Sequence, residues 1–255
     1  MKLRYPAEAF ALGIVLFSAG MKEAFAAGIL VIFTSVFAEL LKNLLEKAVP
    51  TWSLKFCVYI ASGSVCASAF LTGFAVLGTV LTTELWIMVF IVGLLCGKHA
   101  LSGNTDSEYG EFLLESAFVW GLWILFTVFR EFLGSGSIFG NTVFTASFQS
   151  KAFLNTTFAF MEAGLVLASV NGILKKDCKG MNSLFPVVPA MFLFHPFTVE
   201  SFAGLPGTVW VIAVPILLFL SVKQTLKFAR TGRFFRGLPV DMLAAGFIYM
   251  ILSIY

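Results

Sequence analysis

A series of long apolar stretches, with charged residues gathered against their ends, constrains this chain more than any other feature. The clearest stretch runs from Phe112 to Leu133. A helix needs about 20 consecutive apolar residues to cross a bilayer. Only 12% of the residues are charged and 59% are hydrophobic, whereas soluble domains carry about 25% charged residues. Because so few charges cannot cover a core with polar surface, the sequence predicts a membrane protein.

The predicted fold class is all-α: a polytopic transmembrane helical bundle of eight or nine apolar segments. The first, fourth and seventh segments are short or broken by proline, and the first suits a half-helix. In chain order the segments are Ala7 to Ala19, Ala24 to Leu45, Leu54 to Phe74, Leu85 to Cys96, Phe112 to Leu133, Phe153 to Leu174, Leu184 to Phe197, Gly207 to Val222 and Leu238 to Tyr255.

Basic residues predict how the chain is oriented. The net charge of +3 is small. The basic residues cluster in loops, and in a membrane protein this clustering indicates topology and no nucleic-acid partner. Alternate loops carry most of the Lys and Arg, so this side is expected to be cytoplasmic, with the N-terminus inside and the C-terminus outside. The residues on this side are Lys2, Arg4, Lys42, Lys47, Lys55, Lys98, Lys175, Lys176, Lys179, Lys223, Lys227, Arg230, Arg233 and Arg236.

A short internal repeat divides the first part of the chain. Residues Val36 to Leu41 match Val128 to Leu133, and a short segment precedes the long one in both copies. The copies are three segments apart, an odd number, so they are expected to cross the membrane in opposite directions. The predicted repeat halves are residues 1–80 and 81–178.

A signature of charges and spaced glycines closes the segment from Phe112 to Leu133. It resembles the Arg-Glu-x-Leu-Gly-x-Gly-x-x-Phe pattern that ends a long helix in the paired membrane subunits of the Rnf and Na+-translocating Nqr electron-transport complexes. The matching residues are Arg130, Glu131, Leu133, Gly134, Gly136 and Phe139.

The resemblance covers the first six segments in their order, so we interpret residues 1–178 as an Rnf/Nqr-like membrane domain. Residues 179–255 are interpreted as additional transmembrane segments. The stretch from Phe235 to Val240, continued by Ala244 to Gly246, is similar to the last helix of the sister subunit. Residues 180–230 match no pattern of the family.

The resemblance also implies where a cofactor would be held. Two sister subunits of the family bury a [2Fe-2S] cluster, and each supplies one cysteine from each of two half-helices. Here Val15 and Gly93 stand at those positions, and neither can ligate iron. Cys96 lies one turn from Gly93 and is a weak candidate. We therefore expect no cofactor in this chain; a cluster with altered ligands is the alternative.

Glu162 is the first candidate for an ion path, because a carboxylate inside a membrane is costly. It lies near the middle of the segment from Phe153 to Leu174, with no basic residue within a turn. We expect it to be neutral or paired with a cation from another helix. Two hypotheses stay open: binding of a proton or cation, and a structural hydrogen bond to Asn155, Asn171 or a neighbouring helix.

Glu39 and Glu131 are the other two ion-path candidates, at equivalent ends of the repeat. Anchoring at the membrane interface with Lys42 and Arg130 is the alternative for both.

No catalytic residue and no metal site is predicted, since the chain has no phosphate loop, nucleophile elbow or dinucleotide fingerprint. His195 has no second His or Cys nearby in the sequence.

Two functions follow as expectations. The resemblance implies a subunit of an ion-translocating electron-transport complex in a bacterial cytoplasmic membrane, with sister membrane subunits and redox subunits as partners. Without the cysteines, the chain would supply scaffold and ion path and no electron relay, and it would be at most a non-catalytic subunit. The rival is a stand-alone transporter of an ion or small solute with alternating access. A structural assembly factor is a third possibility.

Overall fold

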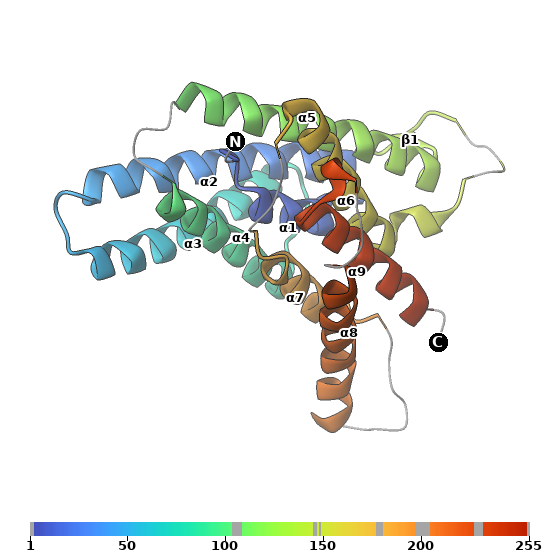
Figure 1. Cartoon of the computed structure of the whole chain (residues 1–255). Helices are drawn as coiled ribbons and strands as arrows, with labels where there is room; N and C mark the ends of the chain where they lie inside the picture. Colours follow the sequence, from blue (N-terminus) through green and yellow to red (C-terminus); the bar gives the residue numbers. More distant parts are fainter. Residues whose placement is uncertain are drawn as a thin grey trace.

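The computed structural model describes residues 3–103, 109–144, 147, 149–176, 181–196, 205–226 and 232–253. Within these ranges the chain is an all-α bundle, as predicted (Figure 1). Two-residue strands β1 (Ser137–Ile138) and β2 (Asn141–Thr142) form one small hairpin. The helices are α1 (Ala7–Phe17), α2 (Met21–Leu45), α3 (Thr51–Val76), α4 (Thr83–Ser102), α5 (Tyr109–Ser135), α6 (Thr156–Leu174), α7 (Leu184–Leu193), α8 (Leu205–Leu226) and α9 (Leu238–Leu252).

Six of these helices are long and apolar enough to cross a membrane: α2, α3, α4, α5, α6 and α8. Their outer faces expose large apolar side chains such as Phe33, Phe56 and Leu125. In water such surface would be unfavourable, whereas lipid chains solvate it. The chain is therefore a multi-pass membrane protein whose outer faces contact the lipid bilayer.

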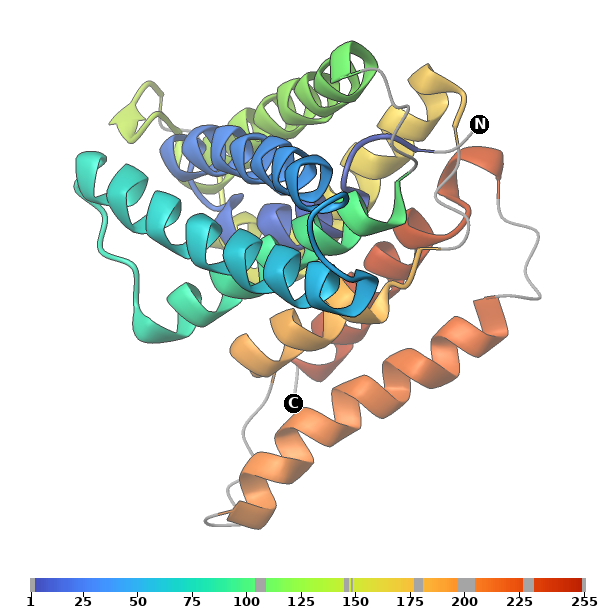
Figure 2. The ribbon, with the colours of Figure 1, turned by 90° about the vertical axis from the view of Figure 1, so that its left-hand side faces the viewer.

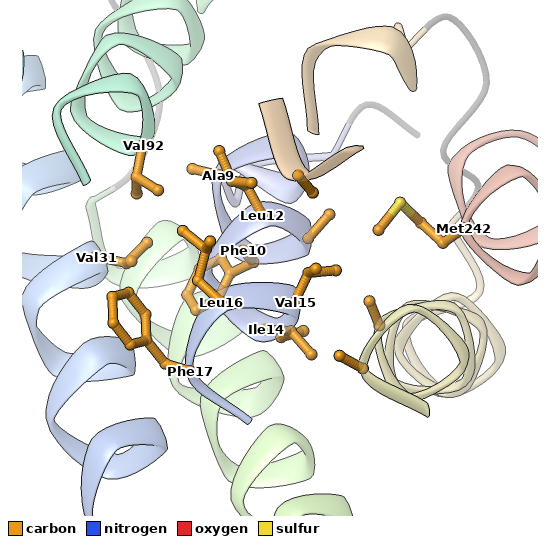
Figure 3. Close-up of a cluster of buried hydrophobic side chains, with 14 of the residues drawn as sticks. Ala9, Phe10, Leu12, Ile14, Val15, Leu16, Phe17, Val31, Val92 and Met242 are labelled. Carbon is orange, nitrogen blue, oxygen red and sulfur yellow. The ribbon is translucent and has the colours of Figure 1, made fainter. Parts of the chain in front are cut away.

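Helix α1 lies at the centre of the bundle, and every one of its residues is buried. It packs against α2, α4, α6 and α7. Figure 3 shows its side chains pointing outward in all directions into the apolar core. A helix that is apolar all round is stable only when other elements surround it. The short first segment is thus confirmed as a half-helix, ending at Phe17.

The predicted short fourth segment is wrong, because α4 is a full helix of 20 residues. It continues through Gly97 and Lys98, where the sequence suggested a break. Glycine in a helix costs about 1 kcal/mol, and tertiary contacts can override that preference. Here Gly97 packs against Ser62 of α3, and Lys98 forms an ion pair with Glu8 of α1.

The two repeat halves run in opposite directions. Glu8 at the start of α1 pairs with Lys98 near the end of α4. Glu131 near the end of α5 binds the backbone of Met21 at the start of α2. Therefore α1 is antiparallel to α4, and α2 is antiparallel to α5, as an inverted repeat requires.

The last three helices attach to one side of this core. Helix α7 forms despite Pro186 and Pro189, and it ends before Pro196; Pro186 lies in the first turn, where proline is tolerated. Helix α9 packs closely on α6. Helix α8 lies at the periphery in both views (Figure 2). Its inner end is held by Lys223, which donates to Ser183 at 2.6 Å and lies 3.7 Å from Asp241.

Candidate functional site

The signature from Arg130 to Phe139 builds a buried junction where α1, α2, α5 and α6 meet. Arg130 is its centre. Its Nε donates to the carbonyl oxygen of Phe153 at 2.7 Å. Its Nη2 donates to the carbonyl oxygens of Leu154 and Asn155, each at 2.9 Å. These carbonyls precede α6, so the guanidinium fixes the chain where it enters that helix.

The remaining nitrogen of Arg130 reaches the interior of the bundle. Nη1 donates to the hydroxyl of Ser18, which caps the end of α1. It also donates to Glu162 Oε2 at 3.3 Å. Thr127 donates to the other carboxylate oxygen, Oε1, at 2.7 Å. Arg130 thus uses all five of its N–H donors and leaves none without a partner.

Glu162 therefore has its cation from outside its own helix. Arg130 and Glu162 are both nearly inaccessible, so this is a buried ion pair. Its predicted position half-way along the helix needs correction, because α6 begins at Thr156. Glu162 is six residues further on, about 9 Å along the helix. The pair lies on the side of the bundle where both α5 and α1 end.

Glu131 is a structural clamp whose two carboxylate oxygens are both occupied. Oε2 accepts the N–H of Met21 at 2.7 Å, which caps the start of α2. Oε1 accepts the N–H of Gly140 at 2.8 Å and the hydroxyl of Ser137 at 3.1 Å. Glu131 thus ties the hairpin after α5 to the start of α2. Its partners differ from Arg130, with which the sequence paired it, because Arg130 pairs with Glu162.

The rest of the signature shapes the same junction. A Cβ at Gly134 would lie 2.6 Å from the side chain of Leu154, so only glycine allows this approach. Gly136 has a φ of 69°, which favours glycine. The carbonyl of Leu133 accepts the N–H of Ser150 at 3.0 Å. Phe139 adopts a φ of 56° in the hairpin turn.

Glu39 is not brought together with the other two candidates. It lies half-buried near the far end of α2, 18 residues from Met21, which is about 27 Å of helix. Its neighbour Lys42 donates to the carbonyl of Gly103 at 2.8 Å and joins α2 to the end of α4. Glu39 and Glu131 hold equivalent sequence positions at opposite ends of the bundle.

A second charged group, which the sequence did not predict, surrounds the start of α1. Glu8 pairs with Lys98 of α4 at 2.6 Å. Its other oxygen accepts the N–H of Asn182 at 2.9 Å, next to the start of α7. The ammonium of Lys98 also lies 3.7 Å from the ring centre of Phe185.

The same group includes a buried pair between Glu115 of α5 and Lys176, just after α6. The second oxygen of Glu115 accepts the N–H of Arg4 at 3.0 Å. The side chain of Arg4 pairs with Glu111 at 3.0 Å. Glu8 and Glu115 could have been noticed as carboxylates within apolar segments. Their partners could not, because they come from distant parts of the chain.

These two groups form separate charged layers. We call Ser18, Thr127, Arg130, Glu131 and Glu162 the junction cluster. We call Arg4, Glu8, Lys98, Glu111, Glu115 and Lys176 the lysine cluster. Glu115 and Arg130 are 15 residues apart on α5, or about 22 Å. A hydrocarbon core is about 30 Å thick. Two layers about 22 Å apart both fit within the hydrocarbon core. The charged side chains of each layer are therefore stable only when they pair with one another.

The positions to which the Rnf/Nqr resemblance assigns cluster cysteines, Val15 and Gly93, do not fit an iron–sulfur group here. Val15 offers no ligand atom and is buried in the apolar core. A Cβ at Gly93 would lie 2.6 Å from the Cβ of Cys66 and 2.5 Å from the carbonyl of Ser62, so α3 leaves no room for a side chain. Val92 is the neighbour of Gly93 on α4. In Figure 3, Val15 and Val92 lie on different sides of α1.

The cysteines of the described residues are free thiols. Cys66 and Cys96 are buried and Cys57 is exposed, while Cys178 lies outside the described residues. No group of three or more His, Cys, Asp or Glu side chains in the described part of the chain could hold a metal ion.

Comparison of the chain with protein-family models, curated proteins and solved structures found no match.

Proposed function

We propose that this protein is a membrane subunit of an Rnf/Nqr-type ion-translocating electron-transport complex, in which it supplies scaffold and an ion path. The observation that carries the proposal is the junction built by residues 130–140. It ties the end of the half-helix α1 and the start of α2, which belong to one repeat half, to the end of α5 in the other half. The residues that resemble the family thus have a shared mechanical task, and Val15 and Gly93 argue against a role as electron relay.

The complex would lie in a bacterial cytoplasmic membrane with the N-terminus of this chain inside. Arg4, Lys98, Lys176 and Lys223 gather at the α1-start end of the bundle. Because positive charge favours the cytoplasmic side, this end is assigned to the cytoplasm. Reporter fusions at Gly232 are expected to be cytoplasmic and fusions at Gly140 external. The reverse pair of results would refute the orientation.

The subunit role is tested by ion transport in membranes of the host cell. Inverted vesicles from a strain lacking this gene should lose Na+ or H+ uptake driven by NADH or reduced ferredoxin. The wild-type chain and a variant at an exposed position, Glu84→Gln, should restore uptake. Arg130→Ala should not. Unchanged uptake in the deletion strain would refute the proposal.

A direct redox role is tested on the purified chain. We expect no stoichiometric iron and no acid-labile sulfide, because neither Val15 nor Gly93 supplies a thiolate. An electron paramagnetic resonance signal of a [2Fe-2S] centre that disappears in Cys96→Ser would contradict this expectation.

The buried Arg130–Glu162 pair supports a second candidate, a stand-alone ion or solute transporter. The pair lies beside the end of a buried half-helix, and broken helices form binding sites in inverted-repeat transporters. Under this hypothesis the chain alone, in proteoliposomes, catalyses gradient-driven uptake that Glu162→Gln abolishes. Uptake that requires additional subunits would favour the complex.

A further inference from the structure

A short turn before α9 exposes basic and aromatic side chains together. It is the 3-10 helix η2 (Arg233–Phe235). Phe234 is 48% exposed and Phe235 is 37% exposed, and Arg233 and Arg236 on either side of them are exposed as well. Large apolar side chains are unfavourable in water, whereas a charged group is costly to remove from it. A surface that carries both kinds of side chain therefore suits the boundary between water and lipid.

The contacts of η2 place it at this boundary. Asn171 Nδ2 donates to the carbonyl oxygen of Phe234 at 3.1 Å. A Cβ at Gly172 would lie 3.6 Å from the ring of Phe234. Asn171 and Gly172 belong to the last turn of α6, a helix long and apolar enough to cross a membrane. In Figure 2 the start of the red helix α9, which follows η2, lies at the periphery of the bundle. The turn is thus level with the lipid headgroups and beside the surrounding lipid.

Lys175 adds a second positive charge near Arg233. It follows Asn171 by four residues, about one helical turn, and it is exposed. Among the residues that the structure describes, neither Arg233 nor Lys175 forms an ion pair. Three carboxylates at the same end of the bundle already have basic partners: Glu111 pairs with Arg4, Glu115 with Lys176 and Asp241 with Lys223. The charge of Arg233 and Lys175 is therefore available to an anion from outside the chain.

We propose that Arg233, Lys175 and the two phenylalanines of η2 bind one anionic phospholipid at the membrane surface. A guanidinium donates two parallel hydrogen bonds to phosphate oxygens, and an ammonium adds a point charge. The acyl chains cover the rings of Phe234 and Phe235, which a soluble anion would leave in water. Basic groups beside spanning helices recognise anionic headgroups in this way. The site is independent of any role in ion movement.

Lipid binding is tested on the purified, delipidated full chain in detergent, titrated with phosphatidylglycerol or phosphatidylcholine and read by native mass spectrometry. Phosphatidylglycerol should bind at least about fivefold more tightly. Arg233→Gln should weaken its binding about fivefold, because each basic residue near an anionic surface contributes about this factor. Lys55→Gln is the matched control and should change little, since Lys55 is exposed at the start of α3, which packs against α2 and α4. Equal binding of the two lipids, or an equal loss in the two variants, would overturn the proposal.

Thermal melting separates a lipid site from a site for free phosphate. Phosphatidylglycerol should raise the melting temperature of the wild-type chain by at least about 3 °C, and by less than half as much in Arg233→Gln and in Phe235→Ala. Glycerol 3-phosphate carries the phosphate without acyl chains and should leave it unchanged. An equal rise with glycerol 3-phosphate would show a site for soluble phosphate and refute the lipid proposal.

The same measurement without lipid controls for folding. Both variants change exposed side chains, so in lipid-free detergent they should melt with the wild-type chain. Neither assay involves ion transport or partner subunits. A failure here would therefore leave the proposed scaffold function standing.

Discussion

The junction cluster and the lysine cluster both hold charged side chains inside the bundle, but they pair these charges with different chemistry. In the junction cluster one guanidinium makes five hydrogen bonds and holds three segments together. In the lysine cluster three separate ion pairs share the task, and Lys98 keeps a third of its side chain accessible. Arginine suits the first arrangement because its planar fork is pre-organised, whereas lysine acts as a point charge.

The contrast predicts how each end responds to damage. Where one residue satisfies many buried acceptors, its loss leaves several groups unpaired at once. Where the charge is divided among several pairs, each loss stays local, and accessible partners can turn to water. We therefore expect substitutions at the junction cluster to cost more stability than substitutions at the accessible basic residues of the lysine cluster, such as Lys98.

The largest effect is expected for Arg130→Ala. It leaves Glu162 buried without its cation, which costs about 3–5 kcal/mol in comparable pairs. The free energy of unfolding in detergent, or the melting temperature of the solubilised protein, measures the loss. Arg130→Lys should recover little, because lysine cannot reproduce the fork. Arg233→Ala, at an exposed position, is the control and should have no effect. A loss below about 1 kcal/mol for Arg130→Ala would contradict the role of Arg130 as the central residue of the junction cluster.

Glu162 substitutions should have the next largest effect and separate the two hypotheses about this residue. Glu162→Leu leaves Arg130 with its three carbonyl partners and the hydroxyl of Ser18 but without a carboxylate, and should cost about 2–3 kcal/mol. Glu162→Gln keeps the bond to Thr127 and should cost less. The double variant Arg130→Met with Glu162→Leu should be more stable than Arg130→Ala, since no buried charge remains.

Activity of Glu162→Gln decides the functional question. If Glu162 binds a proton or cation, the variant folds normally and ion-dependent transport is lost. If its role is structural, transport is nearly unchanged, and only Glu162→Leu lowers the amount of protein in the membrane. We favour the structural outcome, because both carboxylate oxygens already have partners.

A side chain at position 93 should have an intermediate effect, far from either charged end. Gly93→Cys would force α3 and α4 apart, since its Cβ would overlap Ser62, Gly63 and Cys66. Overpacking of this kind costs about 1–3 kcal/mol. Thermal melting of the solubilised protein measures it. Gly121→Cys is the matched control, because a Cβ at Gly121 meets nothing within 4 Å. Equal stability of the two variants would show that α3 and α4 can separate at no cost.

The smallest effect is expected in the lysine cluster. Lys98→Met removes one partner of Glu8, but Glu8 keeps the N–H of Asn182. Partly accessible ion pairs contribute about 0–1 kcal/mol, and salt screens them. Stability should therefore fall by no more than about 1 kcal/mol, and the difference from wild type should shrink in high salt. A loss as large as that of Arg130→Ala would remove the contrast between the two ends.

Hydropathy predicted the helices well and their ends less well. The segment from Phe112 to Leu133 corresponds to α5, which extends from Tyr109 to Ser135. The failure at α4 has a physical cause. Gly97 and Lys98 are unfavourable locally, but close packing on α3 and pairing with Glu8 compensate for both.

The sequence by itself determined that this chain crosses a membrane, that it does so as helices, and that its first segment is too short to span alone. These properties depend on apolar length and local composition, which neighbouring residues define. Only the tertiary structure decided which charges pair. Lys98 is 90 residues from Glu8, and Lys176 is 61 residues from Glu115. A buried charge is stable only beside its partner, and helix packing, which no local pattern encodes, brings the partners together.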